Sequence, residues 1–440
     1  MTETANRLQY DLTAGTPVPA EGILDGSGHS RDPAATLAAL RGIGQDGWKR
    51  FLTGVLASER QRISGRAAAS AETARWDDST EIGDDGIGFD SLARMELSAV
   101  LNQRLGLSQT GVEDYLLVHT RLGDWARLLE EHFIQYPSDR TPLLGFSTSG
   151  STGDPKEISH SAAALLNEVM GIVANAGSVR RVVSLVPCHH IYGFLFGLLL
   201  PSALGVAVLD RTRVPPTSVL DKAEPGDLIV ATPFHWGMIA ADGPAVPPGV
   251  QALSSGAPSK PAQWAMARKR GMAAMIEIYG STETSGVGMR TDCNAPFDLL
   301  PHLVRNGDRI GTSGGVVLPL QDRLDWCSTR QFRPKGRLDG AIQIGGVNVI
   351  PSSVAGILSE NPEVADVVVR PEDTLNGRLK AFVVPQGEDN EPTNLEANLR
   401  AAMAARLPAA ARPVSYTFGS ALPRNDMGKL ADWAISRGDG

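Results

Sequence analysis

A run of hydroxyl-bearing residues and glycines that ends in a lysine has the composition of a phosphate-binding loop. It reads Phe146-Ser147-Thr148-Ser149-Gly150-Ser151-Thr152-Gly153-Asp154-Pro155-Lys156. Glycines let the backbone approach an anion closely, and exposed N–H groups and hydroxyls donate hydrogen bonds to phosphate oxygens. Lys156 adds a positive charge. The common pattern Gly-x-x-x-x-Gly-Lys-Ser/Thr is absent, so we predict a phosphate loop of another kind, with a flexible Ser/Gly linker as the alternative.

Three other segments carry side chains that could act on a phosphate ester. The first is the segment 277–284, which follows an apolar run and contains Tyr279, Thr282 and Glu283. The second pairs Asp322 with Arg337, and the third contains Gly428-Lys429 near the end of the chain. A carboxylate can hold a hard cation such as Mg²⁺, and cationic side chains neutralise the charge of phosphates.

The segment 143–336 alternates short apolar runs with helical patterns, which predicts an α/β domain. This alternation is typical of a mostly parallel sheet covered by helices on both faces. We predict strands at 182–186, 205–209, 228–231 and 275–278, and helices at 160–176, 216–223, 234–241 and 260–270. Ligands bind beyond the carboxyl ends of such strands, so the loops 146–156, 187–192 and 279–283 should converge on one crevice.

The two ends of the chain have other patterns. Residues 1–33 are polar and rich in Gly, Pro and Asp, so we predict a loosely ordered extension. Residues 340–440 combine strand-like apolar runs with a long helical segment, which predicts a small α+β domain with a core of its own. Between this domain and the preceding one lies a polar joint, Gly336-Arg337-Leu338-Asp339-Gly340.

Helical spacing dominates residues 34–135. Asp90, in Gly88-Phe89-Asp90-Ser91-Leu92, can cap a helix whose predicted buried residues are Leu92, Met95, Val100, Leu101 and Leu105. The region resembles an acyl or peptidyl carrier domain, and the resemblance implies a phosphopantetheine group on Ser91. One alternative is that Asp-Ser-Leu is an ordinary helix start. The carrier-like fold is either a structural substitute for another lobe or part of a compact ligase that loads its own Ser91.

Composition argues against several classes of protein. The 440 residues are 42% hydrophobic and 20% charged, which is ordinary for a soluble globular protein of two or three domains. A net charge of −8 disfavours nucleic acid as the main partner. The three cysteines have no metal-ligand spacing and suit a reducing compartment. We find no signal-peptide core and no uninterrupted apolar span, so we predict a cytoplasmic protein without a membrane segment.

The four chemical segments occur in one order: Thr-Ser-Gly-Ser-Thr-Gly-x-Pro-Lys, Tyr-Gly-Ser-Thr-Glu, Gly-Arg-x-Asp and Pro-x-x-x-x-Gly-Lys. Together they resemble the adenylate-forming superfamily of acyl-CoA synthetases, aryl-CoA ligases and peptide-synthetase adenylation domains. The resemblance implies an α/β adenylate-forming fold, with a large mostly parallel-sheet domain at 143–336 and a small mobile domain at 340–440. It also implies that an acid and ATP form an acyl-adenylate with release of pyrophosphate, and that a thiol then displaces AMP.

The resemblance further implies roles for individual residues. Residues 148–153 and Lys156 should grip the β- and γ-phosphates, Glu283 should bind Mg²⁺, and Thr282 should contact the α-phosphate. The other implied nucleotide contacts are Tyr279, Gly280, Ser255, Gly256 and Ala257 around the adenine, Asp322 at the ribose hydroxyls, and Arg337 at the ribose or a phosphate. Lys429 should bridge the acid carboxylate and the α-phosphate, and Asp339 should be the hinge of the small domain.

The acid pocket is predicted from the same resemblance. His190, in His189-His190-Ile191-Tyr192-Gly193, matches a gate residue beside the acyl group. The other predicted pocket walls are Phe234, His235, Trp236, Gly286 and Gly288. Glu157 stands where the family usually has glycine, and we expect it to point outward, because a carboxylate near phosphates is unfavourable.

The sequence and the resemblance also predict the class of the acid substrate and of the thiol acceptor. Amino-acid-activating members hold the substrate ammonium with an aspartate, and none lies between Val186 and Gly197, so we predict an aryl or acyl acid. We therefore predict an ATP- and Mg²⁺-dependent acid–thiol ligase whose acceptor is CoA or the phosphopantetheine of an acyl carrier protein. The alternative functions are a non-catalytic adenylate or acyl binder and a carrier scaffold of a biosynthetic pathway such as secondary metabolism.

Overall fold

The computed structural model describes residues 8–11, 16–19, 33–64, 70–148, 156–174, 176–337, 340–372, 378–387, 392–423 and 432–433. These residues form two compact units. The first unit draws on Met1–Ser147, Glu157–Leu320 and Trp326–Arg333, and the second on Thr148–Lys156, Gln321–Asp325 and Pro334–Gly440. Each unit contains its own hydrophobic core.

Helices make up most of the N-terminal part of the first unit. They are α1 (Pro33–Arg41), α2 (Gly44–Ser64), α3 (Ser70–Thr73), α4 (Ser91–Leu105), η2 (Leu107–Gln109), α5 (Glu113–Val118) and α6 (Leu122–Gln135). Two short strands, β1 (Leu8–Asp11) and β2 (Thr16–Pro19), pair antiparallel within the predicted extension. Trp48 of α2 stacks on Phe133 of α6 with ring centroids 4.8 Å apart, and both side chains are fully buried. Aromatic packing therefore joins these two helices.

Helix α4 begins where the sequence predicts, but it buries a different face. The carboxylate of Asp90 accepts a hydrogen bond from Ala93 N at 2.8 Å and caps the helix. The prediction that Leu92 and Met95 are buried is wrong, because their side chains are 66% and 58% exposed. The buried row runs at four-residue intervals through Ala93, Leu97, Leu101 and Leu105. With about 3.6 residues per turn, a helix that buries this row turns Leu92 and Met95 toward solvent.

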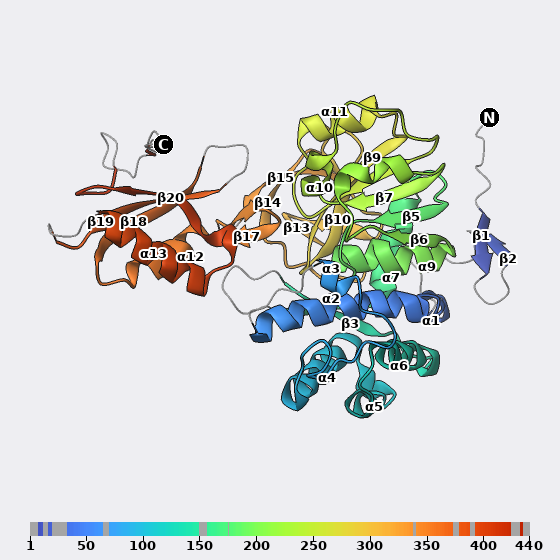
Figure 1. Cartoon of the computed structure of the whole chain (residues 1–440). Helices are drawn as coiled ribbons and strands as arrows, with labels where there is room; N and C mark the ends of the chain where they lie inside the picture. Colours follow the sequence, from blue (N-terminus) through green and yellow to red (C-terminus); the bar gives the residue numbers. More distant parts are fainter. Residues whose placement is uncertain are drawn as a thin grey trace. The chain divides into compact units, whose positions relative to one another are not determined.

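The N-terminal helices pack onto the sheet region of the same unit (Figure 1). Ser202 Oγ donates a hydrogen bond to Ala39 O of α1 at 2.5 Å, although the two residues are far apart in sequence. Glu157, which we expected to point outward, instead pairs with Arg104 of α4, because the arginine neutralises the carboxylate within the protein. The helical region 34–135 and the sheet region therefore share one compact unit.

A nine-stranded mixed sheet has the strand order β14-β15-β11-β10-β9-β8-β7-β5-β6. The parallel part contains β5 (Arg181–Ser184), β6 (Ala207–Asp210), β7 (Asp227–Ala231), β8 (Gln251–Ser254) and β9 (Ala274–Ser281), all of which the sequence predicts except β8. The part joined by antiparallel pairs from β9 onward contains β10 (Ser285–Arg290), β11 (Phe297–Leu299) and β15 (Gln331–Arg337), with β14 (Asp322–Trp326) at the edge. Every residue of β7 is buried, as expected for a parallel strand covered on both faces.

Helices and hairpins connect these strands. They are α7 (Ala162–Val173), α8 (Ile191–Phe194), η3 (Leu195–Leu199), α9 (Leu200–Leu204), α10 (Pro233–Met238), α11 (Pro261–Lys269), and the hairpins β3 (Leu143–Ser147) with β4 (Glu157–Ser161) and β12 (Leu303–Asn306) with β13 (Arg309–Thr312). The predicted helices at 160–176, 234–241 and 260–270 are confirmed. The predicted helix at 216–223 is instead two short 3₁₀ turns, η4 (Pro216–Ser218) and η5 (Leu220–Lys222). Strand β8 was missed because Gln-Ala-Leu-Ser has no β-branched residue.

The second unit contains the small α+β domain that the sequence predicts. Its elements are β16 (Ile342–Ile344), β17 (Val347–Val349), α12 (Pro351–Ser359), β18 (Val364–Pro371), β19 (Leu379–Pro385), α13 (Pro392–Arg406), η6 (Ala409–Ala411) and β20 (Pro413–Phe418). Strand β19 pairs antiparallel with β18 and parallel with β20, and α12 and α13 contribute to the core of this unit. Within the described ranges of both units, every helix is too short or too polar to span a bilayer.

Candidate active site

The turn between β9 and β10 presents Thr282 and Glu283. Its ends are closed by Ser281 N, which donates to Thr284 Oγ1 at 3.1 Å, and by Thr284 N, which donates to Ser281 Oγ at 3.3 Å. Ser285 follows with φ of 57°, the one positive φ among the described non-glycine residues. This conformation costs energy for a residue with a Cβ, and such strain occurs at functional turns. Thr282 and Glu283 are therefore held, half-buried, at the carboxyl end of β9.

A histidine that the sequence analysis missed anchors this turn. His160 Nε2 of β4 lies 2.7 Å from Thr282 O and donates a hydrogen bond to it. Burial lowers the pKa of His160, and Thr282 O and Glu283 oppose this only in part, so the ring is neutral at pH 7. The sequence offers one signal for it, a histidine on the short strand that follows the predicted phosphate loop.

The loop after β8 lies beside the end of β9. Ser255 Oγ donates to Ile278 O at 3.0 Å, and Ile278 directly precedes Tyr279. Gly256 has φ of 90°, a conformation that favours glycine, and it is exposed. The structure thus places Ser255, directly after β8, beside the residue that precedes Tyr279 on the neighbouring strand β9. Glu277, by contrast, is buried and paired with Arg290, whose Nε lies 2.6 Å away.

The predicted acid-pocket residues do not gather on one surface. On α10, Phe234 is 68% exposed, whereas Trp236 is buried in the hydrophobic core. His235 Nδ1 accepts a hydrogen bond from Thr232 N at 3.2 Å and so caps the helix start, and burial lowers its pKa. His190 is exposed directly before α8, in the loop after β5. Its neighbour Tyr192 donates its hydroxyl toward Ala231 O and Leu253 O, at 3.1 and 3.0 Å.

Side chains fill the space beside both predicted glycine walls on β10. A Cβ at Gly286 would lie 2.4 Å from Glu168 Oε1, and a Cβ at Gly288 would lie 2.7 Å from Phe332 Cζ. Glu168, on α7, is almost fully buried. Burial raises its pKa to about 7, and the nearby Ser285 hydroxyl and Gly286 N–H lower it only in part. A carboxyl group with a pKa of about 7 therefore lies against the first residues of β10.

The second unit contains the ends of the predicted phosphate loop and the predicted ribose contacts. Thr148 N donates to Lys156 O at 2.8 Å, and Lys156 N donates to Thr148 Oγ1 at 3.1 Å, which closes the ends of the loop. Asp322 begins β14 and Arg337 ends the neighbouring strand β15. The remaining predicted residues, Ser149, Gly150, Ser151, Thr152, Gly153, Asp339 and Lys429, lie outside the described residues.

The carboxylate chemistry fits a magnesium ion held together with a nucleotide. Among the described residues, no group of three or more His, Cys, Asp or Glu side chains could form a protein-only metal site. Mg²⁺ is ordinarily bound by only one or two carboxylates together with substrate phosphates and water. The single half-buried Glu283 is sufficient for that arrangement.

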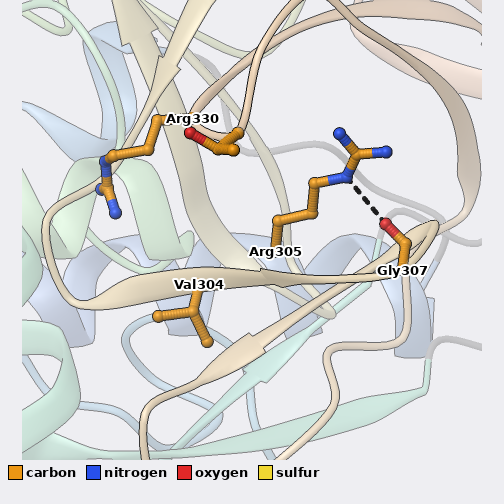
Figure 2. Close-up of a pocket in the computed structure, with 5 residues that line it drawn as sticks. Val304, Arg305, Gly307 and Arg330 are labelled. Atoms are coloured by element: carbon orange, nitrogen blue, oxygen red, sulfur yellow. Dashed lines mark hydrogen bonds between the residues drawn. The ribbon is translucent and has the colours of Figure 1, made fainter.

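Two hollows in the described part of the first unit are candidate binding sites. One, of about 470 Å³, lies at the β12–β13 hairpin and is lined by Val304, Arg305, Gly307, Thr329 and Arg330. Figure 2 shows its two guanidinium groups turned away from each other. Arg305 Nε donates to Gly307 O at 2.8 Å, and Arg330 donates to three backbone carbonyls between residues 299 and 303, so both arginines stabilise the local structure. The other hollow, of about 350 Å³, contains His190 and lies against α2.

Two family models and several curated enzymes match this chain. A family model described as "AMP-binding enzyme" matches residues 101–350, and one described as "AMP-binding enzyme C-terminal domain" matches residues 353–429. A 4-coumarate–CoA ligase of Rhodobacter capsulatus is 42% identical over 391 residues, covering 88% of this chain and 99% of the relative. One of Halorhodospira halophila is 38% identical over 400 residues, covering 89% and 100%. Matches of this length exceed the part of the chain from Leu143 onward, so they include N-terminal helices.

Two solved structures resemble the fold. The o-succinylbenzoate CoA synthetase of Bacillus subtilis superposes with a TM-score of 0.53 at 17% identity, over 69% of this chain and 72% of that one. The amide bond synthetase McbA of Marinactinospora thermotolerans superposes with a TM-score of 0.52 at 22% identity, over 65% and 67%. At these identities the similarity concerns the fold alone.

Proposed function

The chain belongs to the AMP-binding enzyme family, and from this premise we propose that it joins an aryl carboxylic acid of the hydroxycinnamate class to the thiol of CoA. Family membership confirms the predicted adenylate-forming fold and the predicted class of enzyme, an AMP-forming acid–thiol ligase. The observation that carries the aryl substrate is the 38–42% identity to 4-coumarate–CoA ligases, over 85–100% of their length. The absence of an aspartate between Val186 and Gly197, where amino-acid-activating members hold an ammonium group, agrees with this choice.

The first step forms an acyl-adenylate. The acid carboxylate attacks the α-phosphorus of ATP, a new P–O bond forms, and the bond to pyrophosphate breaks. Both reactants are anionic, so charge neutralisation dominates the barrier. Glu283 would hold Mg²⁺, which supplies positive charge to the phosphates. Thr282 would donate to the α-phosphate, and Lys156 and Lys429 would add cationic charge at the phosphates and at the attacking carboxylate.

The second step forms the thioester. The thiol of CoA, as thiolate, attacks the acyl carbon, and AMP leaves with the electron pair of the broken C–O bond. His160 supports both steps indirectly, because it holds the turn that carries Thr282 and Glu283. The roles proposed for Asp322 and Arg337 at the ribose, and for Asp339 as the hinge of the small domain, follow the family pattern described above.

A carrier-bound acceptor is a second candidate, because the surface around Ser91 is unusual. Ser91 is exposed at the first position of α4, and the apolar side chains of Leu92 and Met95 are exposed beside it. An exposed serine at a helix start next to apolar side chains would suit a modified carrier segment. Incubation with a phosphopantetheinyl transferase and CoA, followed by mass spectrometry of the Ser91 peptide, tests this; an unmodified peptide excludes it.

ATP–pyrophosphate exchange with a panel of acids tests the main proposal. We expect exchange with 4-hydroxycinnamate and related aryl acids, weak exchange with fatty acids, and none with α-amino acids. Addition of CoA should then yield the aryl-CoA thioester, detected by mass spectrometry. No exchange with any acid would instead support a non-catalytic adenylate or acyl binder.

A further inference from the structure

A carboxyl group lies buried without a counter-charge on α7, the helix that follows β4. It belongs to Glu168, which is 2% exposed. Burial is the main cause of its raised pKa, and no charged neighbour among the described residues contributes to the shift. An unpaired carboxyl inside a protein costs folding free energy, and such groups gather at functional sites. Glu168 has no role in the two reaction steps described above, so its carboxyl is a candidate for a contact with the substrate.

A glycine on β10 makes room for this carboxyl. A Cβ at Gly286 would lie 2.4 Å from Glu168 Oε1 and 2.8 Å from Glu168 Cδ, so any larger residue at this position would push the carboxyl away. The third neighbour of that Cβ would be Leu300 Cδ1, at 3.2 Å, and Leu300 is buried. The carboxyl thus lies against the backbone at the start of β10, beside an apolar side chain.

A serine hydroxyl near the carboxyl also lacks a partner. Ser285 Oγ is buried and makes no hydrogen bond of normal geometry among the described residues. The Ser285 hydroxyl and the Gly286 N–H both lower the pKa of Glu168, so both lie close to its carboxyl. Buried polar atoms are nearly always paired. Glu168 and Ser285 therefore form a polar pair that can still bind a hydrogen-bonding group.

The chain segment that carries Glu168 also holds the turn between β9 and β10. His160 Nε2 of β4 donates to Thr282 O at 2.7 Å, and α7 begins two residues later. Six residues into that helix, the Glu168 carboxyl reaches Gly286, on the other side of the same turn. These two contacts fix the position of the carboxyl relative to Thr282 and Glu283.

The acid substrate must lie close to the same turn. Its carboxylate has to reach the α-phosphate, which Thr282 would contact, so the rest of the acid lies against a surface beside the turn. Strand β10 provides one such surface, since Gly286 pairs with Gly280 of β9. The predicted pocket walls Gly286 and Gly288 both belong to β10. An aryl ring that extends along β10 would therefore meet the carboxyl of Glu168.

The chemistry of the polar pair suits a hydroxyl on that ring. A protonated carboxyl both donates and accepts hydrogen bonds, and so does a serine hydroxyl. A phenolic hydroxyl can therefore donate to one of the two side chains and accept from the other. A cationic substituent would need an ionised carboxylate, whereas burial raises the pKa of Glu168 to about 7 and keeps much of it protonated at neutral pH. An apolar substituent would leave both polar groups without a partner.

We propose that Glu168, together with Ser285, binds the ring hydroxyl of the aryl acid and so selects hydroxylated aryl acids over unsubstituted ones. The inference rests on the proposed function, since it names the part of the acid that this site recognises. A site that hydrogen-bonds a substrate hydroxyl rejects the analogue without it, because the analogue leaves buried polar groups unpaired. Glu168 is then a specificity-determining residue that contacts the substrate.

The variant Glu168→Leu tests the proposal, with 4-hydroxycinnamate and cinnamate as a matched pair of acids. ATP–pyrophosphate exchange gives kcat/KM for each acid. The ratio of kcat/KM for 4-hydroxycinnamate to that for cinnamate should fall about tenfold, because one hydrogen bond is worth up to about tenfold in binding. The KM for cinnamate should stay the same or fall, and the KM for ATP should not change. Glu131→Leu, which removes the carboxyl of an exposed ion pair on α6, should keep the wild-type ratio.

Two further variants separate the hydrogen bond from the fold. Glu168→Gln keeps a group that donates and accepts, so its ratio should stay within about threefold of the wild-type ratio. Ser285→Ala removes the other polar group and should lower the ratio, as Glu168→Leu does. These two variants carry the test if Glu168→Leu does not fold.

An unchanged ratio in Glu168→Leu, or in Ser285→Ala if the leucine variant does not fold, would contradict the inference. An equal loss of exchange with both acids, together with a raised KM for Mg²⁺, would also contradict it, since Glu168 would then support the turn of Thr282 and Glu283 and not the substrate. If the wild type shows exchange with no aryl acid, the proposed function is wrong and the inference fails with it. Exchange with aryl acids but an unchanged preference in the variants contradicts the inference alone.

Discussion

Arg104 of α4 and Glu157 of β4 form a buried ion pair, with Arg104 Nε 3.1 Å from Glu157 Oε1. Ser147 Oγ completes the group, since it accepts from Arg104 Nη2 at 2.5 Å and donates to Glu157 Oε2 at 2.6 Å. Glu59 Oε1 lies 3.8 Å from the same arginine. The pair joins the helical region to β4, the strand that follows the predicted phosphate loop.

Replacement of Glu157 by alanine should therefore destabilise the protein. Removal of one partner from a buried pair leaves an uncompensated charge and costs about 3–5 kcal/mol. We expect about 3 kcal/mol, at the lower end of that range, because Glu59 remains near Arg104. Urea denaturation followed by circular dichroism measures the loss. Glu131→Ala, which removes the exposed partner of Arg127, is the control and should change stability by less than about 0.5 kcal/mol.

Trp48→Ala should lower the stability of the first unit as a whole. Trp48 is fully buried and stacks on Phe133. The centroid of its ring lies 6.3 Å from that of Phe194 of α8. Loss of a buried tryptophan costs about 3–5 kcal/mol. Because the ring touches helices on both sides of the predicted domain boundary, hydrogen exchange should rise in the sheet as well as in α2 and α6. Faster exchange confined to residues 34–135 would mean that the helices fold independently.

Glu168→Gln should remove one source of pH dependence from stability. The pKa of Glu168 is about 7 in the folded protein against an ordinary 4.5, so the folded state holds its proton more tightly than the unfolded state. The stability that this raised pKa gives the folded protein is fully present below about pH 4.5 and is lost as the pH rises through 7. At pH 8 the neutral glutamine should therefore stabilise the protein by roughly 3 kcal/mol at most. Denaturation midpoints at pH 5 and pH 8 measure this; a variant less stable than the wild type at pH 8 contradicts it.

His132 should make the helical region sensitive to acid. Its ring is fully buried between Thr110 Oγ1 and Leu105 O, and burial lowers its pKa from 6.5 to about 4. The unfolded chain therefore takes up a proton that the folded protein excludes, and stability falls as the pH drops from about 6.5 to 4. In His132→Gln the free energy of unfolding should depend less steeply on pH in this window, by the amount that corresponds to about one proton fewer taken up on unfolding. His119→Gln, in which the ring replaced is partly exposed, should keep the wild-type slope.

Lys429→Ala should separate the two half-reactions. If Lys429 stabilises the charge that develops when the carboxylate attacks ATP, exchange should fall by roughly a hundredfold or more. Transfer from a supplied aryl-adenylate to CoA should continue, because that step forms no new bond to phosphorus. Glu283→Gln should likewise lose exchange, and a higher Mg²⁺ concentration should restore part of it. Normal exchange in Lys429→Ala would contradict the role proposed for this lysine.

Much of the fold could be predicted because it depends on residues close together in sequence. Asp90 caps α4 through an N–H three residues away. Residues 228–231 of β7 form a continuous apolar run, the pattern of a strand that is buried on both faces. The turn at 281–284 is closed by its own side chains. Leu92 and Met95 were misplaced because both faces of α4 carry apolar residues, and local spacing alone could not choose between them.

By itself the sequence determined the family, most of the parallel strands, and the residues available for charge neutralisation. Only the tertiary structure decided which distant surfaces meet. His160 reaches Thr282 across 122 residues, Arg104 reaches Glu157 across 53, and Gly54 admits His189 against α2. Such contacts depend on how two elements pack, and packing is set by the shapes of both surfaces at once. A sequence motif contains no such information, so the hollow between α2 and the loops after β5 and β6 is visible only in the tertiary structure.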